Sequence, residues 1–364
     1  MKILLIGEYS GLHNNLSEGL LELGHEVTIA SSGDGWKNFH TDIALSKTHF
    51  KGRLGKIESK FNLFRVAETA ANYDIIQLIS YKQVGPYLNP LFIKKLFNKN
   101  PNIFILATGS SPITTKYQRK NFPYCPFSIS REEIDSVDCS DVEKFIKQSK
   151  NPLMILEEKK CLKYAKKIIP TSISYLLPYQ NASNCIKDFI PMPINTKKYQ
   201  NVLFDSKKNN GKIKILYGLS RGCLKGHVHI KKALDKIQEI KLKNIEITII
   251  NQVSFNNYVS LVRDCDFLID QCKSYSYGMN ALLGLAMGKI VFSGAENSIK
   301  EQLKNCPIVN INPDHLDIYN KIMNLIENSD EIICKKKQAL LFVQENHDYI
   351  NIAKKYLNIW TSNM

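Results

Sequence analysis

The chain has 364 residues and a formal net charge of +15, with 44% hydrophobic and 23% charged residues. A single core rarely grows beyond about 250–300 residues, so the length favours two domains, and the composition excludes a disordered chain. No apolar run approaches the ~18 residues of a membrane-spanning helix, and Glu8 interrupts the first apolar run too early for a signal peptide. We therefore expect a cytoplasmic protein.

The nine cysteines are odd in number and scattered along the chain, with no C-x-x-C pair. Disulfide frameworks and zinc sites need regular, close spacing of their ligands. We therefore expect reduced thiols and no metal site.

The excess of lysine and arginine is spread through both halves of the chain. Many nucleic-acid-binding proteins instead carry a concentrated basic tail, or a stripe of basic and aromatic residues. Neither pattern is present in the sequence, so nucleic acid is not an expected partner.

The N-terminal half alternates apolar strands with helices. Residues 2–6 form an apolar run that predicts a buried strand, leucines at three- and four-residue steps predict a helix over 16–23, and residues 27–30 predict a second strand. This succession is a βαβ unit, whose right-handed crossover requires a parallel sheet. Further strands are expected at 75–79, 103–107 and 167–170, and helices at 91–97 and 153–165.

The proline-bracketed segment 190–195 ends this half, because proline stops helices and central strands. The lysine- and asparagine-rich stretch after it predicts a linker. We expect an N-terminal domain at 1–195, a linker at 196–212, a C-terminal domain at 213–345 and a C-terminal helix at 346–364. The alternation resumes after the linker, with strands expected at 213–217, 245–250, 267–270 and 290–292, and helices at 228–240, 258–262, 280–287 and 329–360.

The loop after the expected strand 213–217 is the first candidate binding site. Ligands of parallel sheets bind beyond the carboxyl ends of the strands. Gly218 and Gly226 allow close approach of the backbone, and the next helix points its N-terminus at the same space. Arg221 and Lys225 add two positive charges, which suits a diphosphate. The loop lacks the P-loop pattern, and the alternative is an ordinary turn with two solvated cations.

The loop after the expected strand 267–270 is the second candidate. Asp270 closes the strand, and a polar, aromatic stretch leads into a short helix whose first N–H groups are free to donate to an anion. An equal alternative is that the tyrosines pack in the core. The residues expected to contribute are Tyr275, Ser276, Tyr277, Gly278, Met279 and Asn280.

The loop 7–15 is the third candidate. Gly11 allows close approach of the backbone, and His13 is a possible donor or base, with a surface histidine at a helix start as the alternative. The sequence order assembles no Ser/His/Asp or Cys/His set, and the acidic residues at 132–143 predict a solvated loop.

Five motifs in order resemble the GT-B glycosyltransferases of the family 4 (group 1) type, as a divergent subgroup. The motifs are Gly24-His25-Glu26-Val27, Lys167–Ser172, Pro191–Asn195, Gly218 with Arg221, Lys225 and Gly226, and Tyr277–Leu282. The resemblance implies an α/β fold with two Rossmann-like domains, an inter-domain cleft and a C-terminal helix that packs back.

The resemblance also implies roles for individual residues. Arg221 and Lys225 would act as the catalytic pair that neutralises the departing diphosphate. Gly11, Gly218 and the stretch Tyr275–Asn280 would bind the donor, and His13 and Thr108 would lie on the acceptor side. No metal or cofactor is expected, since the nucleotide-sugar is a substrate, and retention of configuration is implied.

Two departures from the family pattern concern the donor and the acceptor. The family pairs two glutamates eight positions apart, and Tyr275 and Leu283 stand at those positions here. A histidine that often ends a central N-terminal strand is also missing, because residues 107–110 read Ala-Thr-Gly-Ser. The contacts of the two glutamates must be made by other residues, such as Ser276, Tyr275 or Asn280, or be lost.

The expected activity is transfer of a sugar from a UDP- or GDP-sugar to a glycan or lipid-linked acceptor, as a hexosyltransferase. The expected setting is bacterial surface polysaccharide synthesis, such as lipopolysaccharide O-antigen or capsule, in the cytoplasm and at the inner face of the plasma membrane, where the net charge suits anionic lipid. The alternatives are a nucleotide-sugar 2-epimerase of the same fold and a non-enzymatic protein that binds anionic surfaces.

Overall fold

A computed structural model describes residues 1–46, 52–85, 88–199, 212–242, 244–297 and 302–364. The chain folds into two compact units: unit 1 comprises residues 1–117, 146–195 and 347–364, and unit 2 comprises residues 118–145 and 196–346. The domain limits given above stay a prediction, and most of the expected linker, at 200–211, lies outside the described residues. Within the described residues, no helix is long and apolar enough to cross a membrane.

Unit 1 contains a six-stranded parallel sheet in the order β3-β2-β1-β4-β5-β6. This is the strand order of a Rossmann domain, in which the direction of winding reverses between the first and fourth strands. The strands expected from the sequence are therefore confirmed. Their bounds are β1 Lys2–Ile6, β2 Glu26–Ser31, β3 Ile43–Ala44, β4 Ile75–Leu78, β5 Ile103–Ala107 and β6 Lys167–Pro170.

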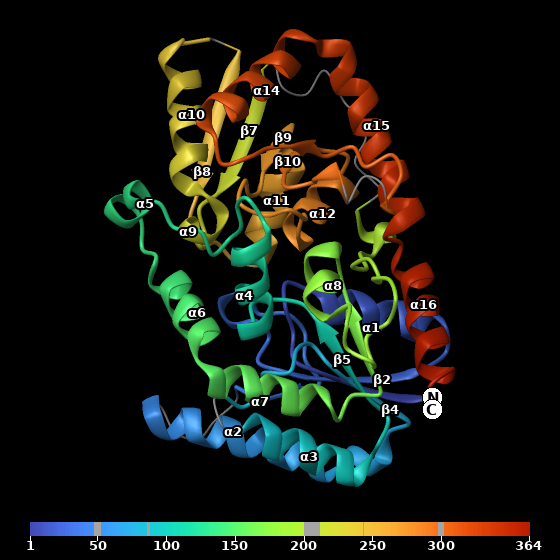
Figure 1. Cartoon of the computed structure of the whole chain (residues 1–364). Helices are drawn as coiled ribbons and strands as arrows, with labels where there is room; N and C mark the ends of the chain where they lie inside the picture. Colours follow the sequence, from blue (N-terminus) through green and yellow to red (C-terminus); the bar gives the residue numbers. More distant parts are fainter. Residues whose placement is uncertain (47–51, 86–87, 200–211, 243, 298–301) are drawn as a thin grey trace. The chain divides into compact units, whose positions relative to one another are not determined.

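Helices cover both faces of this sheet (Figure 1). On one face, Leu63, Phe92 and Leu162 form a core with strand residues. On the other, a Cβ at Gly19 would lie 2.3 Å from the Tyr349 carbonyl oxygen, so glycine permits close packing of the first and last helices. The helices are α1 Leu12–Glu22, α2 Gly52–Glu68, α3 Asn89–Lys99, α7 Pro152–Leu162, α8 Ile173–Tyr179 and α16 Tyr349–Thr361, with short 3-10 turns η1 Gly35–Lys37 and η2 Ala70–Asn72.

Unit 2 contains a five-stranded parallel sheet in the order β11-β10-β9-β7-β8. Helices α10 and α14 share a core with one face, and Gly284 of α12 packs on Leu268 of the other. Together with unit 1, this confirms the predicted fold class of two Rossmann-like α/β domains. The elements are β7 Ile213–Gly218, α9 Gly222–Lys225, α10 His227–Glu239, β8 Ile245–Ile250, α11 Phe255–Asp264, β9 Phe267–Ile269, α12 Met279–Ala286, β10 Ile290–Ser293, β11 Val309–Asn310, α14 His315–Glu327 and α15 Ser329–Asn346, with η3 Thr196–Lys198.

Residues 118–145 belong to unit 2 although they precede the last strand of unit 1. Helix α4 (Pro112–Asn121) leads into this segment, α5 (Arg131–Ser136) lies within it, and α6 (Ser140–Lys150) leads out of it. A disulfide joins Cys139 to Cys223 of α9, which lies 84 residues later. The expectation of reduced thiols is therefore wrong for this pair, because the fold brings together two cysteines whose spacing in the sequence gives no signal.

The same segment contains a buried ion pair. The Lys273 ammonium lies 2.8 Å from the Glu133 carboxylate, and the two side chains are 3% and 2% exposed. Glu133 also accepts a hydrogen bond from the Ser130 backbone N–H in a capping box at the start of α5. The expected solvated acidic loop at 132–143 is therefore wrong at Glu133, since this carboxylate neutralises a buried lysine.

The C-terminal tail, expected to be helical over 329–360, forms two helices, α15 and α16. His347 interrupts it, because its ring is buried and hydrogen-bonds to the Met192 carbonyl oxygen at 2.7 Å. Asp348 then caps α16 by accepting from the backbone N–H groups of Ile350 and Asn351. The helix before the break belongs to unit 2 and the helix after it belongs to unit 1.

Candidate binding site

The winding of the sheet in unit 2 reverses between β7 and β9. Ligands of open α/β sheets bind beyond the carboxyl ends of the strands at such a reversal. The loops after these two strands are the first and second candidate sites of the sequence, and their side chains meet there.

The loop after β7 has a fixed backbone shape. Gly218 is the last residue of the strand, and Arg221 adopts a left-handed conformation with φ 60° just before α9. A Cβ at Gly226, where φ is 81°, would lie 2.4 Å from the Cys272 sulfur, and the Cys272 N–H donates to the Lys225 carbonyl oxygen at 3.0 Å. The loop is thus held against the start of the second candidate loop.

The Asp270 carboxylate is the centre of the polar contacts at this edge. Its Oδ1 lies 3.0 Å from the Lys225 ammonium and accepts a hydrogen bond from the Asn280 side-chain amide at 2.8 Å. Its Oδ2 accepts from the Ser293 hydroxyl at 3.3 Å. Asp270 is 3% exposed and Lys225 is 16% exposed. The structure therefore brings Lys225 and Asn280 together through a buried carboxylate.

Tyr258 extends this network from α11. Its hydroxyl donates to the Asn280 side-chain oxygen, and burial raises its pKa far above the ordinary value. The hydroxyl consequently stays protonated and fixes the direction of the Asn280 amide, which then donates to Asp270. Sequence reasoning missed Tyr258 and Ser293, because neither lies in a motif and each arrives from a different element of the unit.

The two cations expected at a diphosphate differ in their surroundings. Lys225 is paired with Asp270, so part of its charge is already neutralised. Arg221 is exposed, and within the described part of the chain the structure records no ion pair for it. The electrostatic attraction of this edge for an anion therefore comes mainly from Arg221.

The start of α12 is open to a ligand. Gly278 caps this helix without a side-chain hydrogen bond, and a Cβ placed on it would meet no atom within 4 Å. Met279 and Asn280, which begin the helix, are half-buried. Unpaired N–H groups at a helix start favour an anion, so this end of α12 suits a phosphate.

The preceding residues pack within unit 2, which favours the core alternative for the tyrosines. Tyr275 stacks on Phe122 with ring centroids 4.1 Å apart, and buried Tyr277 meets Phe342 edge to face at 6.3 Å. Ser276 is buried, and its carbonyl oxygen accepts from the Gln271 side chain at 3.1 Å. In the described structure these three residues therefore hold the loop in place.

The third candidate loop lies in unit 1 and is closed by a carboxylate. Buried Glu8 accepts the backbone N–H groups of Gly11 and Asn14, each at 2.9 Å, at the start of α1. Burial raises the pKa of Glu8. Gly11 has φ 86°, which favours glycine. Sequence reasoning gave Glu8 no role, although a carboxylate at a helix start is a known stabilising pattern.

His13 and Thr108 also lie in unit 1. His13 is fully buried, with Nδ1 2.7 Å from the Gly7 carbonyl oxygen and Nε2 3.3 Å from the Gln77 amide nitrogen. Burial lowers the pKa of His13 to about 4, so the ring is neutral at pH 7. Its contacts support the loop, while Thr108 is half-buried beside Gly109. Their acceptor roles stay predictions.

Glu158 gives unit 1 a testable pH dependence. Burial raises the pKa of Glu158 to about 7 from its ordinary 4.5, although it accepts from the Ile113 N–H at 3.0 Å and from the Tyr179 hydroxyl. The folded state therefore favours the protonated acid, so its stabilising contribution is complete below pH 4.5 and is lost as pH rises through 7. Burial lowers the pKa of both His13 and His347 to about 4. Because these buried rings resist protonation, they lower the stability of the folded state as the pH falls below 6.5.

We expect Glu158→Gln to lose more stability than the wild type on going from pH 7 to pH 5, by about 2 kcal/mol. The reason is that the variant lacks the gain from protonation while both histidines still oppose folding in acid. Urea unfolding at the two pH values measures the difference. Parallel losses in the two proteins would show that Glu158 titrates normally.

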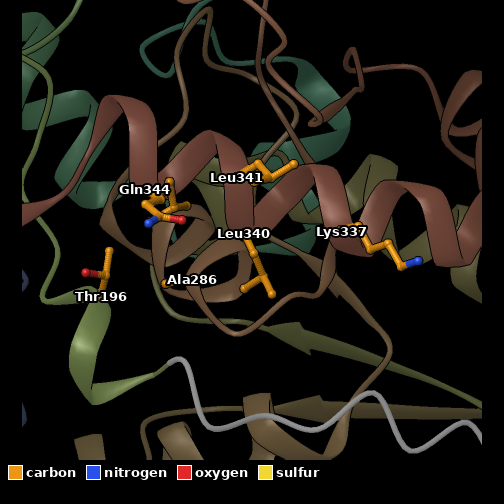
Figure 2. A pocket seen from close by; sticks show the side chains of 7 residues that line it. Thr196, Ala286, Lys337, Leu340, Leu341 and Gln344 are labelled. Carbon is orange, nitrogen blue, oxygen red and sulfur yellow. The ribbon is translucent and has the colours of Figure 1, made fainter.

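A pocket of about 480 Å³ in unit 2 lies away from these polar groups, between α12 and α15. Four of its seven lining residues are apolar, and none of the seven belongs to the three candidate loops. Figure 2 shows the residues along one stretch of α15 beside Ala286 and Thr196, and the full lining is Thr196, Ala286, Lys337, Leu340, Leu341, Val343 and Gln344.

Solved structures with the same fold include complexes with nucleotide-sugars. Sucrose-phosphate synthase from Thermosynechococcus elongatus superposes with a TM-score of 0.65 at 15% identity, over 100% of this chain and 99% of that chain. An alpha-glucosyltransferase in complex with UDP-glucose and DNA containing an abasic site gives 0.62 at 13% identity, over 99% of each chain. UDP-GlcNAc 2-epimerase from Neisseria meningitidis, bound to UDP-GlcNAc, gives 0.56 at 11% identity over 100% of both chains.

Comparisons with protein-family models and with curated proteins found no match. At identities this low, the similarity to solved structures shows the fold alone, which is the two-domain GT-B architecture.

Proposed function

We propose that unit 2 binds the diphosphate of a nucleotide-sugar and that the protein is a glycosyltransferase. The observation that carries this proposal is the arrangement of Arg221, Lys225 and Asp270 where the winding of the sheet reverses, beside the open start of α12. The known ligands of the structures with this fold support the same class of donor.

The proposed reaction breaks the bond between the anomeric carbon and the β-phosphate oxygen, and the electron pair leaves with the phosphate. The acceptor hydroxyl oxygen forms the new glycosidic bond, and its proton passes to a phosphate oxygen or to solvent. Arg221 and the N–H groups of α12 stabilise the departing negative charge, because preorganised donors act where charge develops. Asp270 positions Lys225 for the same task.

The more specific assignment of reaction and substrates rests on the sequence motifs. We propose a hexosyltransferase of a divergent family 4 type that retains configuration and uses a UDP- or GDP-sugar. Its acceptor is a glycan or lipid-linked sugar of a bacterial surface polysaccharide, reached from the cytoplasmic side of the membrane. We propose that the reaction needs no metal, since Arg221 and Lys225 supply positive charge at the diphosphate.

The 2-epimerase is the second candidate, and the fold of the Neisseria meningitidis enzyme favours it. An epimerase converts its nucleotide-sugar without a sugar acceptor. Incubation with UDP-GlcNAc alone, followed by analysis of the sugar, separates the two: an epimerised product would contradict the transferase proposal.

Thermal unfolding with UDP, GDP, CDP and ADP tests the donor site. A ligand that binds only the folded state stabilises it by about 2.7 kcal/mol at 100 times its Kd, so we expect a clear rise in Tm with UDP or GDP. Uridine and guanosine are the matched controls, because they lack the diphosphate that the cations bind. Equal shifts with nucleoside and nucleotide, or no shift with any nucleotide, would contradict the proposal and favour the anionic-surface binding protein.

A further inference from the structure

The first half of α2 contributes little to the core of unit 1. Leu54, Ile57 and Phe61 are 60%, 49% and 62% exposed. They follow each other at three- and four-residue steps, so they form one stripe along the helix. Burial in this helix is concentrated in its second half, at Leu63, Val66 and Ala67. Three large apolar side chains are thus presented to the surroundings from a regular helix.

The neighbouring helices continue this surface. Phe64 of α2 meets Phe92 of α3 edge to face at 5.7 Å, and α3 packs in turn on α7. All three helices lie over the same face of the sheet in unit 1 (Figure 1). The apolar side chains that α3 and α7 expose are Leu91, Phe97, Leu153 and Leu156.

The exposed charged side chains of these three helices are mostly positive. Glu68 is exposed, but it pairs with Lys95 at 2.5 Å and with Lys99 at 3.7 Å. Glu157 and Glu158 of α7 are buried, and Glu58 is half-buried. The exposed cations of these three helices are Arg53, Lys60, Arg65, Lys94, Lys99, Lys159 and Lys160.

We propose that this face of α2, α3 and α7 binds an anionic phospholipid surface. Amphipathic helices insert apolar side chains about 5–10 Å into the boundary between headgroups and acyl chains while cations contact the headgroups. Each Lys or Arg near an anionic surface contributes about 1 kcal/mol. Charge complementarity therefore selects anionic lipid as the occupant. The inference deepens the membrane part of the proposed function, and it rests on that part but not on the donor chemistry.

Co-sedimentation of the full-length protein with vesicles tests this face. We expect binding to vesicles of phosphatidylcholine and phosphatidylglycerol, and much weaker binding to phosphatidylcholine alone. Leu54→Asp/Phe61→Asp should reduce binding at least about tenfold, because it removes apolar contacts and adds repulsion from the headgroups. The control Leu316→Asp/Ile333→Asp makes the same change at two exposed apolar residues of unit 2 and should bind like the wild type.

Three results would overturn the proposal: no binding to anionic vesicles, equal binding to neutral ones, or binding unchanged by Leu54→Asp/Phe61→Asp. A concentration-dependent dimer that this variant dissolves would instead assign the face to a second copy of the chain. The nucleotide-induced rise in Tm should be the same in the wild type and both variants. A normal rise without vesicle binding would therefore reject the lipid surface alone, and vesicle binding without a rise would reject the donor site alone.

Discussion

Lys273→Met should destabilise unit 2 by about 3–5 kcal/mol, since removing one partner of a buried ion pair leaves the other charge uncompensated. The Lys273 ammonium lies 2.8 Å from the Glu133 carboxylate and also donates to the carbonyl oxygens of Cys223, at 3.0 Å, and Ser128. Its loss removes the neutralising cation from a buried carboxylate and a donor from two carbonyl oxygens. Urea unfolding followed by circular dichroism measures the change.

The double variant Lys273→Met/Glu133→Leu is the matched control. Replacing both charges by apolar groups of similar volume is often neutral or stabilising, so we expect it to recover most of the loss. Lys231→Met/Asp235→Leu removes an exposed pair of the same type on α10 and should change stability by less than about 1 kcal/mol. A Lys273→Met protein as stable as the wild type would show that the buried ion pair contributes little to the stability of unit 2.

Arg221→Ala should lower kcat about 100-fold or more with the fold intact, because one preorganised donor at a developing charge contributes about that factor. The side chain is exposed, so its loss leaves no buried group unpaired. Turnover with a UDP- or GDP-sugar, measured as release of the nucleoside diphosphate, checks the prediction. Arg221→Lys should recover part of the activity, because it keeps the charge but not the planar donor geometry.

Lys241→Ala is a close control for Arg221→Ala. Lys241 is also an exposed cation with a left-handed backbone, at φ 54°, and it lies at the opposite end of α10. Lys241→Ala removes one positive charge and places alanine in a left-handed conformation, as Arg221→Ala does, but away from the candidate site. Turnover should therefore be unchanged. Equal activity in all these variants would contradict the donor assignment of the loop after β7.

Lys225→Ala is harder to interpret. It also leaves the buried Asp270 carboxylate without its cation, so a drop in stability accompanies any drop in turnover. Comparison with Lys225→Ala/Asp270→Asn separates the two effects, since the double variant restores a neutral site.

The sequence predicted the sheets of both units well, because their strands are short apolar runs separated by amphipathic helices. The expected strand 213–217 is one residue shorter than β7 at its C-terminal end, and the expected helix 228–240 is shifted by one residue from α10. Because the connection between two parallel strands is nearly always right-handed, few arrangements of these strands in a sheet were possible. The candidate loops were found for the same reason, since they follow strands in a parallel sheet.

The contacts made by those loops were not predictable, since they depend on residues far apart in the sequence. Asp270 meets Lys225 across 45 residues, and Lys273 meets Glu133 across 140. The spacing of apolar residues along the sequence gives no information about contacts between residues so far apart. The capping box at Ser130 was a local signal for α5, but it gave no indication that Glu133 would also neutralise a buried lysine.

The division of the chain has a consequence for synthesis. The polypeptide passes from one unit to the other after residues 117, 145, 195 and 346, so neither unit is a continuous stretch. Tyr349, Tyr356 and Trp360 of α16 are almost fully buried in unit 1, whose first strand is made at the other end of the chain. The part of unit 1 that α16 covers therefore stays exposed in a growing chain until residues 349–361 have been made, and unit 2 can complete its packing earlier.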